Sequence, residues 1–264
     1  MQEFIYELKS RNETLYYFGL ICMVAAIIFL ILTRFTTTQV YNINAWIKPF
    51  KFAISIFLYS WTMAWFCHYL PSFNTQFFNW SIIILLGFEI IYIAIQAGRG
   101  QLSHYNISTP FYGVMYIFMA VAASLVAIYT AYVGYLFFQN SFSDLPEYYV
   151  WGIRLGLLIF VIFSFEGFVM GSRLSHTIGG ADGGEGLPIL NWSTKFGDPR
   201  VSHFIGMHAM QVLPILAFYV LKDTKLTILV GVFYGLLSVF TLVQAIQGKP
   251  FFKSRLHSKN EIIR

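Results

Sequence analysis

Charged residues are scarce in this sequence. Only 11% of its 264 residues are Asp, Glu, Lys or Arg, whereas 57% are hydrophobic. An average soluble domain carries about 25% charged residues, and a soluble chain this apolar could not cover its surface with polar groups. Helices that face lipid need no such cover, because the surrounding solvent is itself apolar. The composition therefore excludes an ordinary soluble domain and predicts an all-α integral membrane protein whose main partner is the lipid bilayer.

Cysteine is nearly absent as well. The chain has two cysteines, Cys22 and Cys67, in separate apolar segments, and it contains no CxxC or CxxCH motif. Zinc bound by cysteines, thiol redox chemistry and covalently attached haem c are therefore not supported, and two reduced, buried thiols are expected. The net charge of +5 does not indicate nucleic-acid binding, because the basic excess lies in short loops and in the tail, where membrane proteins carry their orientation signal.

Seven apolar runs are long enough to cross a bilayer, which takes about 20 residues. They cover residues 14–33, 50–70, 77–96, 111–137, 149–171, 201–221 and 225–247. The first run follows an acidic rather than a basic segment, so we expect it to be a retained span and not a cleaved signal peptide. The sequence thus predicts one seven-helix transmembrane domain over residues 1–248, with a long Gly-rich loop at 172–199 and a basic tail at 249–264.

The distribution of basic residues predicts how the bundle is oriented. Cytoplasmic loops of membrane proteins are enriched in Lys and Arg. Most of the 17 basic residues fall on one side if the N-terminus lies outside and the C-terminus lies in the cytoplasm. On that side are the basic tail, segment 34–51 and loop 172–199. We therefore expect loop 172–199 and the tail to be cytoplasmic.

Three ionisable residues lie deep inside the predicted spans, where charged groups are expensive and commonly mark a functional site. Glu89 precedes Gln96 by seven residues, Glu166 precedes Arg173 by seven, and His208 follows the start of its span by about the same number. At 1.5 Å per residue, all three lie roughly 8–11 Å below the cytoplasmic face. We expect Glu89, Glu166 and His208 to meet there as catalytic groups.

Further histidines lie at the membrane face itself, each beside the end of a span. Imidazole and carboxylate groups are ligands for iron and zinc. The candidate metal ligands are therefore His104, His176, His203, His208, Glu89 and Glu166. The candidates for orienting them, or for binding a cofactor, are Arg99, Arg173, Gln96 and Gln211. The alternative, that these residues are interfacial polar groups that satisfy each other, stays open.

The long loop is unusually rich in glycine, with five glycines in the eight residues 179–186. Glycine permits left-handed and tight backbone conformations, so the loop could fold over a site or surround an anion with its amides. A flexible connector is the alternative. The loop lacks the GK[ST] ending of a phosphate-binding P-loop, and nucleotide hydrolysis is therefore not supported.

Residues 176–214 combine the segments HTIGGADGGEGLP, NWS, GDPR and HFIGMHAMQVLP. This stretch resembles an uncharacterised family of bacterial polytopic membrane proteins that share a GGxDGGxGLP loop and an HFxGxHxxQ helix. Pro199 departs from the pattern, which often has Leu before the arginine. The resemblance implies a multi-pass protein of the bacterial inner membrane and a site region, but no reaction.

Three functions fit these observations. The first is a membrane-embedded metal-dependent enzyme, with iron or zinc, that acts on an amphiphilic substrate such as a lipid, carotenoid or quinone. The second is a haem b electron-transfer protein in which two histidines bind the iron and arginines pair with the propionates. The third is a proton-coupled transporter or a receptor, since buried Glu and His suit proton relays, although the outer half of the bundle is poor in polar groups. A retinal protein is disfavoured because the last span has no interior lysine.

Overall fold

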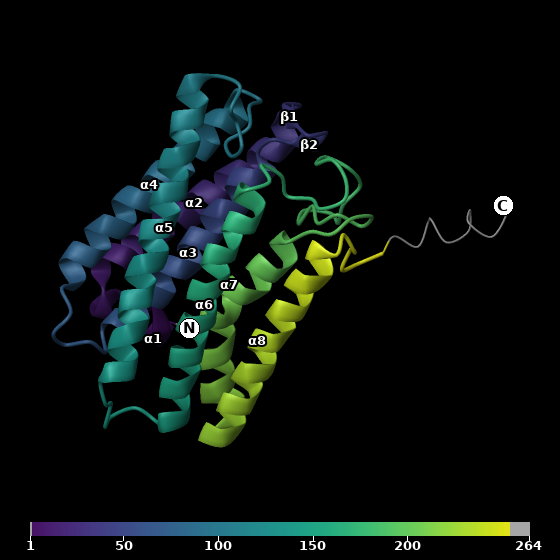
Figure 1. Ribbon diagram of the computed structural model, residues 1–264. Helices are drawn as coiled ribbons and strands as arrows, with labels where there is room; N and C mark the ends of the chain where they lie inside the picture. The colour runs from purple at the N-terminus through teal and green to yellow at the C-terminus, as the bar shows by residue number, and fades with distance from the viewer. Residues whose placement is uncertain (1, 254–264) are drawn as a thin grey trace.

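The computed structural model describes residues 2–253, and it is a bundle of seven long helices (Figure 1). Each of the seven is long and apolar enough to cross a membrane. They are α2 (Glu13–Phe35), α3 (Ile47–Cys67), α4 (Thr75–Gly98), α5 (Pro110–Gln139), α6 (Glu147–Gly171), α7 (Arg200–Leu216) continued by the π-helical turn η1 (Ala217–Leu221), and α8 (Thr224–Ile246). The predicted all-α, seven-span membrane fold is confirmed.

Two short elements lie outside the spans. Helix α1 (Gln2–Arg11) precedes the first span, and a small antiparallel hairpin, β1 (Gln39–Val40) with β2 (Ile43–Asn44), joins α2 to α3. The hairpin, loop 99–109, loop 172–199 and the end of α8 gather at one end of the bundle (Figure 1). We call this the loop end. Its placement in the cytoplasm stays a prediction, and residues 254–264 of the expected basic tail lie outside the described residues.

Four of the spanning helices begin at a polar side chain. Such a residue accepts a hydrogen bond from a backbone N–H of the first turn, which would otherwise have no partner within the helix. The capping residues are Asn12 for α2, Asn74 for α4, Thr109 for α5 and Asp223 for α8. At the end of the bundle opposite the loop end, Asn12 also exchanges two amide hydrogen bonds of 3.0 and 2.8 Å with Asn79 of α4. Polar groups near the membrane boundary are thereby satisfied within the protein.

Helices α6 and α7 approach closely because small residues lie at their crossing. A Cβ atom at Gly156 of α6 would lie 2.8 Å from the Ala209 carbonyl oxygen, and one at Gly152 would lie 3.0 Å from the Cα of Pro214. Gly206 of α7 likewise packs directly on the ring of Phe163. Glycines spaced in this way let helix backbones touch, and van der Waals packing then holds them together. This crossing determines how α7 presents its histidines to α6.

The loop of residues 172–199 is folded although it has no helix or strand. Isolated β-bridges join Ile178 to Gly197 and Gly186 to Ser193. Gly197 lies directly against the backbone of Ala245 at the end of α8, where no Cβ could fit. The loop is therefore packed on the bundle, and it forms part of the wall of the site described next. The two cysteines are buried free thiols, as expected.

Candidate functional site

Two adjoining cavities lie at the loop end of the bundle. The first, of about 170 Å³, is bounded by the β1–β2 hairpin, the start of α3, residues 101–103 and loop 172–199, and we call it the rim cavity. The second, of about 360 Å³, lies deeper, between α3, α4, α5, α6 and α7, and we call it the membrane cavity. Lys48, Phe52, His176 and Arg200 line both cavities. These four side chains therefore lie between the rim cavity, whose wall mixes polar and apolar groups, and the largely apolar membrane cavity.

The membrane cavity has a wall made mostly of aliphatic, aromatic and small side chains. Ala123 of α5 and Phe165 and Phe168 of α6 belong to this wall and are also exposed on the bundle. The cavity therefore opens sideways between α5 and α6, toward the face that meets lipid. Its polar wall groups include Glu89 and three histidines, His104, His176 and His203.

Glu89 enters this cavity without a partner. The residue is only 6% exposed, and no hydrogen bond or ion pair joins its carboxyl group to any other part of residues 2–253. A polar group in apolar surroundings is costly to leave unbonded, and an ionised one is more costly still. Glu89 is therefore free to bond to a molecule inside the cavity.

Glu166 contacts His203 rather than His208. Its Oε2 lies 3.3 Å from Nδ1 of His203, and the same nitrogen lies 2.7 Å from the carbonyl oxygen of Phe163. Because a carbonyl can only accept, Nδ1 carries the proton and Nε2 is the acceptor nitrogen of the ring. Glu166 itself does not line the cavity. His203, which it contacts, does line the cavity, and both Glu166 oxygens are buried without a hydrogen-bond partner among residues 2–253.

His208 occupies a different environment. Its ring packs edge-on against Phe204, with centroids 4.3 Å apart, and it lines neither cavity. His208 is five positions after His203, which corresponds to about 140° around a helix, so one of the two rings faces α6 and the membrane cavity while the other does not. The two acids and His208 do not converge at one point as the sequence predicted, and His203 takes the place expected for His208.

The other two histidines bond to residues on separate elements. Lys48 Nζ lies 3.1 Å from Nδ1 of His104, which must accept because an ammonium only donates. Burial, with the nearby Lys48 and His176, lowers the pKa of His104 well below its usual value. His176 Nδ1 lies 2.9 Å from Oδ2 of Asp182, and burial outweighs this contact and lowers the pKa of His176 too. Both rings are therefore neutral near pH 7.

Asp182 organises the start of the glycine-rich loop. It accepts hydrogen bonds from the backbone N–H and ring of His176 and from the hydroxyls of Ser175 and Thr177. Burial alone would raise the pKa of Asp182, but the bonds from His176 and Thr177 outweigh it and hold the pKa below its usual value. Asp182 is thus an ionised residue whose bonding capacity is used within the loop.

The candidate metal ligands do not form a shared cluster. Among residues 2–253, no three His, Cys, Asp or Glu side chains lie close enough together to hold one metal ion. Bound iron or zinc stays a prediction, as does haem b.

The four residues expected to support the site are spread over the loop end and the core. Gln96 donates to the carbonyl of Leu102, and Gln211 donates to the hydroxyl of Thr62. Arg99 and Arg173 are exposed and line neither cavity.

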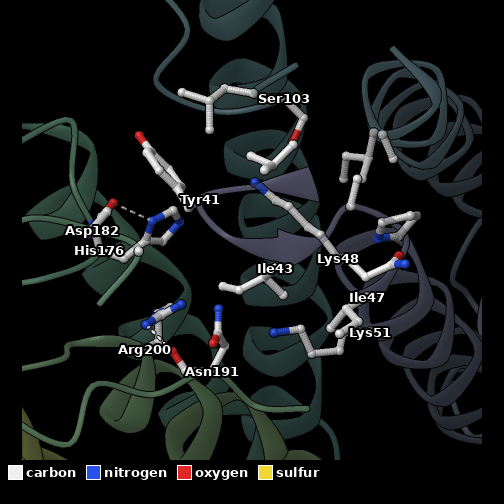
Figure 2. Close-up of a pocket in the computed structure, with 18 of the residues that line it drawn as sticks. Tyr41, Ile43, Ile47, Lys48, Lys51, Ser103, His176, Asp182, Asn191 and Arg200 are labelled. Carbon is white, nitrogen blue, oxygen red and sulfur yellow. Dashed lines mark hydrogen bonds and ion pairs between the residues drawn. The ribbon is translucent and has the colours of Figure 1, made fainter. Parts of the chain in front are cut away.

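The cations that do line the rim cavity are Lys48, Lys51 and Arg200. Figure 2 shows Lys48 and Lys51 entering from α3, opposite His176 and Arg200 on the loop side. From the sequence, Lys48 and Lys51 are expected only as part of the basic segment 34–51 that indicates orientation. Their spacing could have indicated a shared cationic site, because Lys48 and Lys51 are three residues apart and so share one face at the start of a helix.

Comparison with known proteins adds no relative. No family model matches the chain, and neither the curated proteins nor the solved structures contain a significant match. The resemblance to an uncharacterised bacterial membrane family stays a prediction.

Proposed function

We propose that the protein is a membrane-embedded enzyme that takes an amphiphilic small molecule from the bilayer and acts on it by proton transfer at His203. The observation that carries this proposal is the membrane cavity: a largely hydrocarbon space, open toward lipid between α5 and α6, with His203 and Glu89 in its wall. Ligand sites are typically apolar hollows with a few polar groups that orient the ligand. A lipid, carotenoid or quinone-like molecule has the matching chemistry.

His203 is the residue best placed for the chemical step. With Nδ1 donating to the Phe163 carbonyl, Nε2 can take a proton from a substrate hydroxyl or a water and later return it. The imidazolium formed in between is stabilised by the Glu166 carboxylate, whose Oε2 lies 3.3 Å from Nδ1. Glu89, deeper in the same cavity, would bond to a polar group of the substrate. In this proposal Glu89 binds the substrate, Glu166 acts only through His203, and His203 takes the catalytic role that the sequence suggested for His208.

A metal-dependent form of the enzyme uses the same cavity. Iron or zinc would supply activation of water or oxygen when bound, and His203 and Glu89 are candidate donors in the cavity wall, although the described residues hold no group of three His, Cys, Asp or Glu side chains that fits a metal ion. Metal analysis of the purified protein tests this form separately from amphiphile binding.

Amphiphile binding is tested by native mass spectrometry of protein purified in a mild detergent, with extraction and identification of any molecule retained. We expect Ala123→Phe, at the opening between α5 and α6, to lose the retained molecule. Val121→Phe is the matched control, because Val121 is on the same helix, is 49% exposed and lines neither cavity. Equal retention by the two variants would contradict the proposal.

Turnover is tested with the molecule so identified. His203→Gln should keep it bound but leave it unconverted, because the substitution removes the proton-accepting nitrogen and leaves the hydrocarbon wall intact. Conversion at the unmodified rate by this variant would count against His203 as the catalytic base.

A further inference from the structure

The rim cavity contains two lysines with no carboxylate partner. Arg200 is paired with Asp198, with Nε 2.8 Å from Oδ1, and also donates to the carbonyl of Asn191. By contrast, Lys51 Nζ contacts only a carbonyl oxygen, that of Leu190, at 3.1 Å, and Lys48 Nζ contacts the His104 ring. Within residues 2–253, neither lysine has a carboxylate oxygen within ion-pair distance.

One carboxylate, that of Asp182, lines the rim cavity, and a second, that of Asp198, is paired with Arg200 of the wall; both are occupied by other donors. Asp182 accepts from His176, Ser175 and Thr177. Asp198 is buried and accepts from the backbone N–H of Ser193 at 2.7 Å as well as from Arg200. Neither can turn to a lysine without breaking the loop. Like charges held together in a partly buried space repel each other, and a bound anion would offset that repulsion through charge-assisted hydrogen bonds.

Neutral donors face the same space. Figure 2 shows the side chains of Ser103 and Asn191 in the cavity wall with Lys48, Lys51 and Arg200. A planar carboxylate offers two oxygens, whereas a phosphate offers three or four directed around a tetrahedron. Two ammonium groups, an amide and a hydroxyl, with the Nη1 group of Arg200 that Asp198 and Asn191 leave free, suit the larger set of acceptors.

The two cavities are adjacent, because they share wall residues. Lys48, Phe52, His176 and Arg200 each contribute to both walls. A molecule that filled both spaces would therefore have its charged part among the lysines and its chain in the hydrocarbon space.

We infer that the rim cavity binds a phosphate group, and that this phosphate is the headgroup of the amphiphile whose chain lies in the membrane cavity. The second half of this inference rests on the proposed function. The substrate class it names is a phosphate ester of a long-chain alcohol. Free inorganic phosphate would satisfy the same donors, so the experiment must distinguish the two sources.

The experiment measures binding of three probes to the full-length protein in a nonionic detergent: dodecyl phosphate, dodecanol and inorganic phosphate. The test variant is Lys48→Met with Lys51→Met. The matched control is Lys195→Met with Lys249→Met, which removes the same charge from exposed lysines at the loop end that line neither cavity. Lys48→Arg with Lys51→Arg keeps the charge and checks that folding is not the cause of any loss.

We expect the test variant to bind dodecyl phosphate about tenfold or more weakly, which corresponds to about 1.4 kcal/mol. The control and the arginine variant should bind it like the unmodified protein, and dodecanol should bind all four proteins alike. Saturable, lysine-dependent binding of inorganic phosphate at comparable affinity would contradict the inference that the bound phosphate is the headgroup of an amphiphile. Should the double methionine variant fail to fold, Lys51→Met alone gives the same test, because the Lys51 ammonium contacts only the Leu190 carbonyl.

The other outcomes separate the two proposals. If dodecyl phosphate binds the test variant as tightly as the unmodified protein, the phosphate site is wrong while an amphiphile in the membrane cavity stands. If neither dodecyl compound binds the unmodified protein, the proposed function is wrong. In that case, lysine-dependent binding of inorganic phosphate would still support a phosphate site in the rim cavity, without an amphiphile in the membrane cavity.

Discussion

His203 and Glu166 join α7 to α6 through an Nδ1–Oε2 distance of 3.3 Å, at the wall of the membrane cavity. Nδ1 donates its hydrogen bond to the Phe163 carbonyl, and both Glu166 oxygens are buried without a hydrogen-bond partner in the described residues, so Glu166 would act on the ring by its charge. Neither residue reaches this arrangement through local structure. It depends on the α6–α7 crossing.

Glu166→Gln should lower turnover of the bound amphiphile by about a hundredfold without changing its affinity, because the glutamine cannot stabilise the imidazolium. Separate measurement of kcat and KM checks this. His208→Gln is the control, because His208 lines neither cavity. A loss of kcat in His208→Gln together with full activity in His203→Gln would restore the sequence-based assignment.

Acid should destabilise the fold through His104 and His176. Both have a pKa lowered by burial, so the neutral form is favoured in the folded state. Their contribution is complete above the unfolded value of about 6.5 and is lost as pH falls from there toward the lowered folded values. The titratable groups near His104 are Lys48 and His176, and the Ser103 hydroxyl also contacts its ring. We expect Tm in detergent to fall between about pH 7 and about pH 5, and to fall less in His104→Gln. A pH-independent Tm would contradict a neutral His104.

Gly156→Val should destabilise the protein by about 1–3 kcal/mol, because its side chain meets the backbone of Ala209 and Met210 rather than open space. Turnover should fall as well, since the same crossing positions His203. Thermal unfolding in detergent measures the first effect. Gly87→Val on α4 is the matched control, because nothing lies within 4 Å of a Cβ at that position. Equal destabilisation by the two variants would mean that helix propensity, not packing, is responsible.

Metal content tests the metal-dependent form. If it holds, gently purified protein should contain close to one equivalent of iron or zinc, and His203→Ala and Glu89→Ala should each remove it without loss of expression. Less than about 0.2 equivalents in the unmodified protein would contradict this form.

The absorption spectrum of the same sample tests the haem b alternative, since a colourless protein after addition of haemin does not bind haem. Solute flux in proteoliposomes tests the transport alternative.

Several features of the site were predictable from the sequence. Glu89 and Glu166 are buried as expected, because a carboxylate in the middle of an apolar span must point into the protein whatever the fold. His104, His176 and His203 could be assigned to one end of the bundle by counting along the spans, and they line one cavity. The pairing of Glu166 with His203 was not predictable, because it depends on the rotation of α7 against α6. The glycines at 152, 156 and 206 set that rotation through contacts far apart in sequence.

The lysines show the same division. Lys48 and Lys51 carried a clear orientation signal, and their shared face followed from helical spacing. The lack of carboxylate partners for these lysines could not be predicted from the sequence. It arises because Asp182 and Asp198 accept hydrogen bonds from donors that only the folded loop brings to them. The sequence by itself determined the number of spans and the depth of the ionisable groups, since both depend on local hydropathy and on the fixed rise of a helix. The tertiary structure alone decided which groups face each other across the two cavities, since helix rotation and loop closure depend on packing between segments distant in the chain.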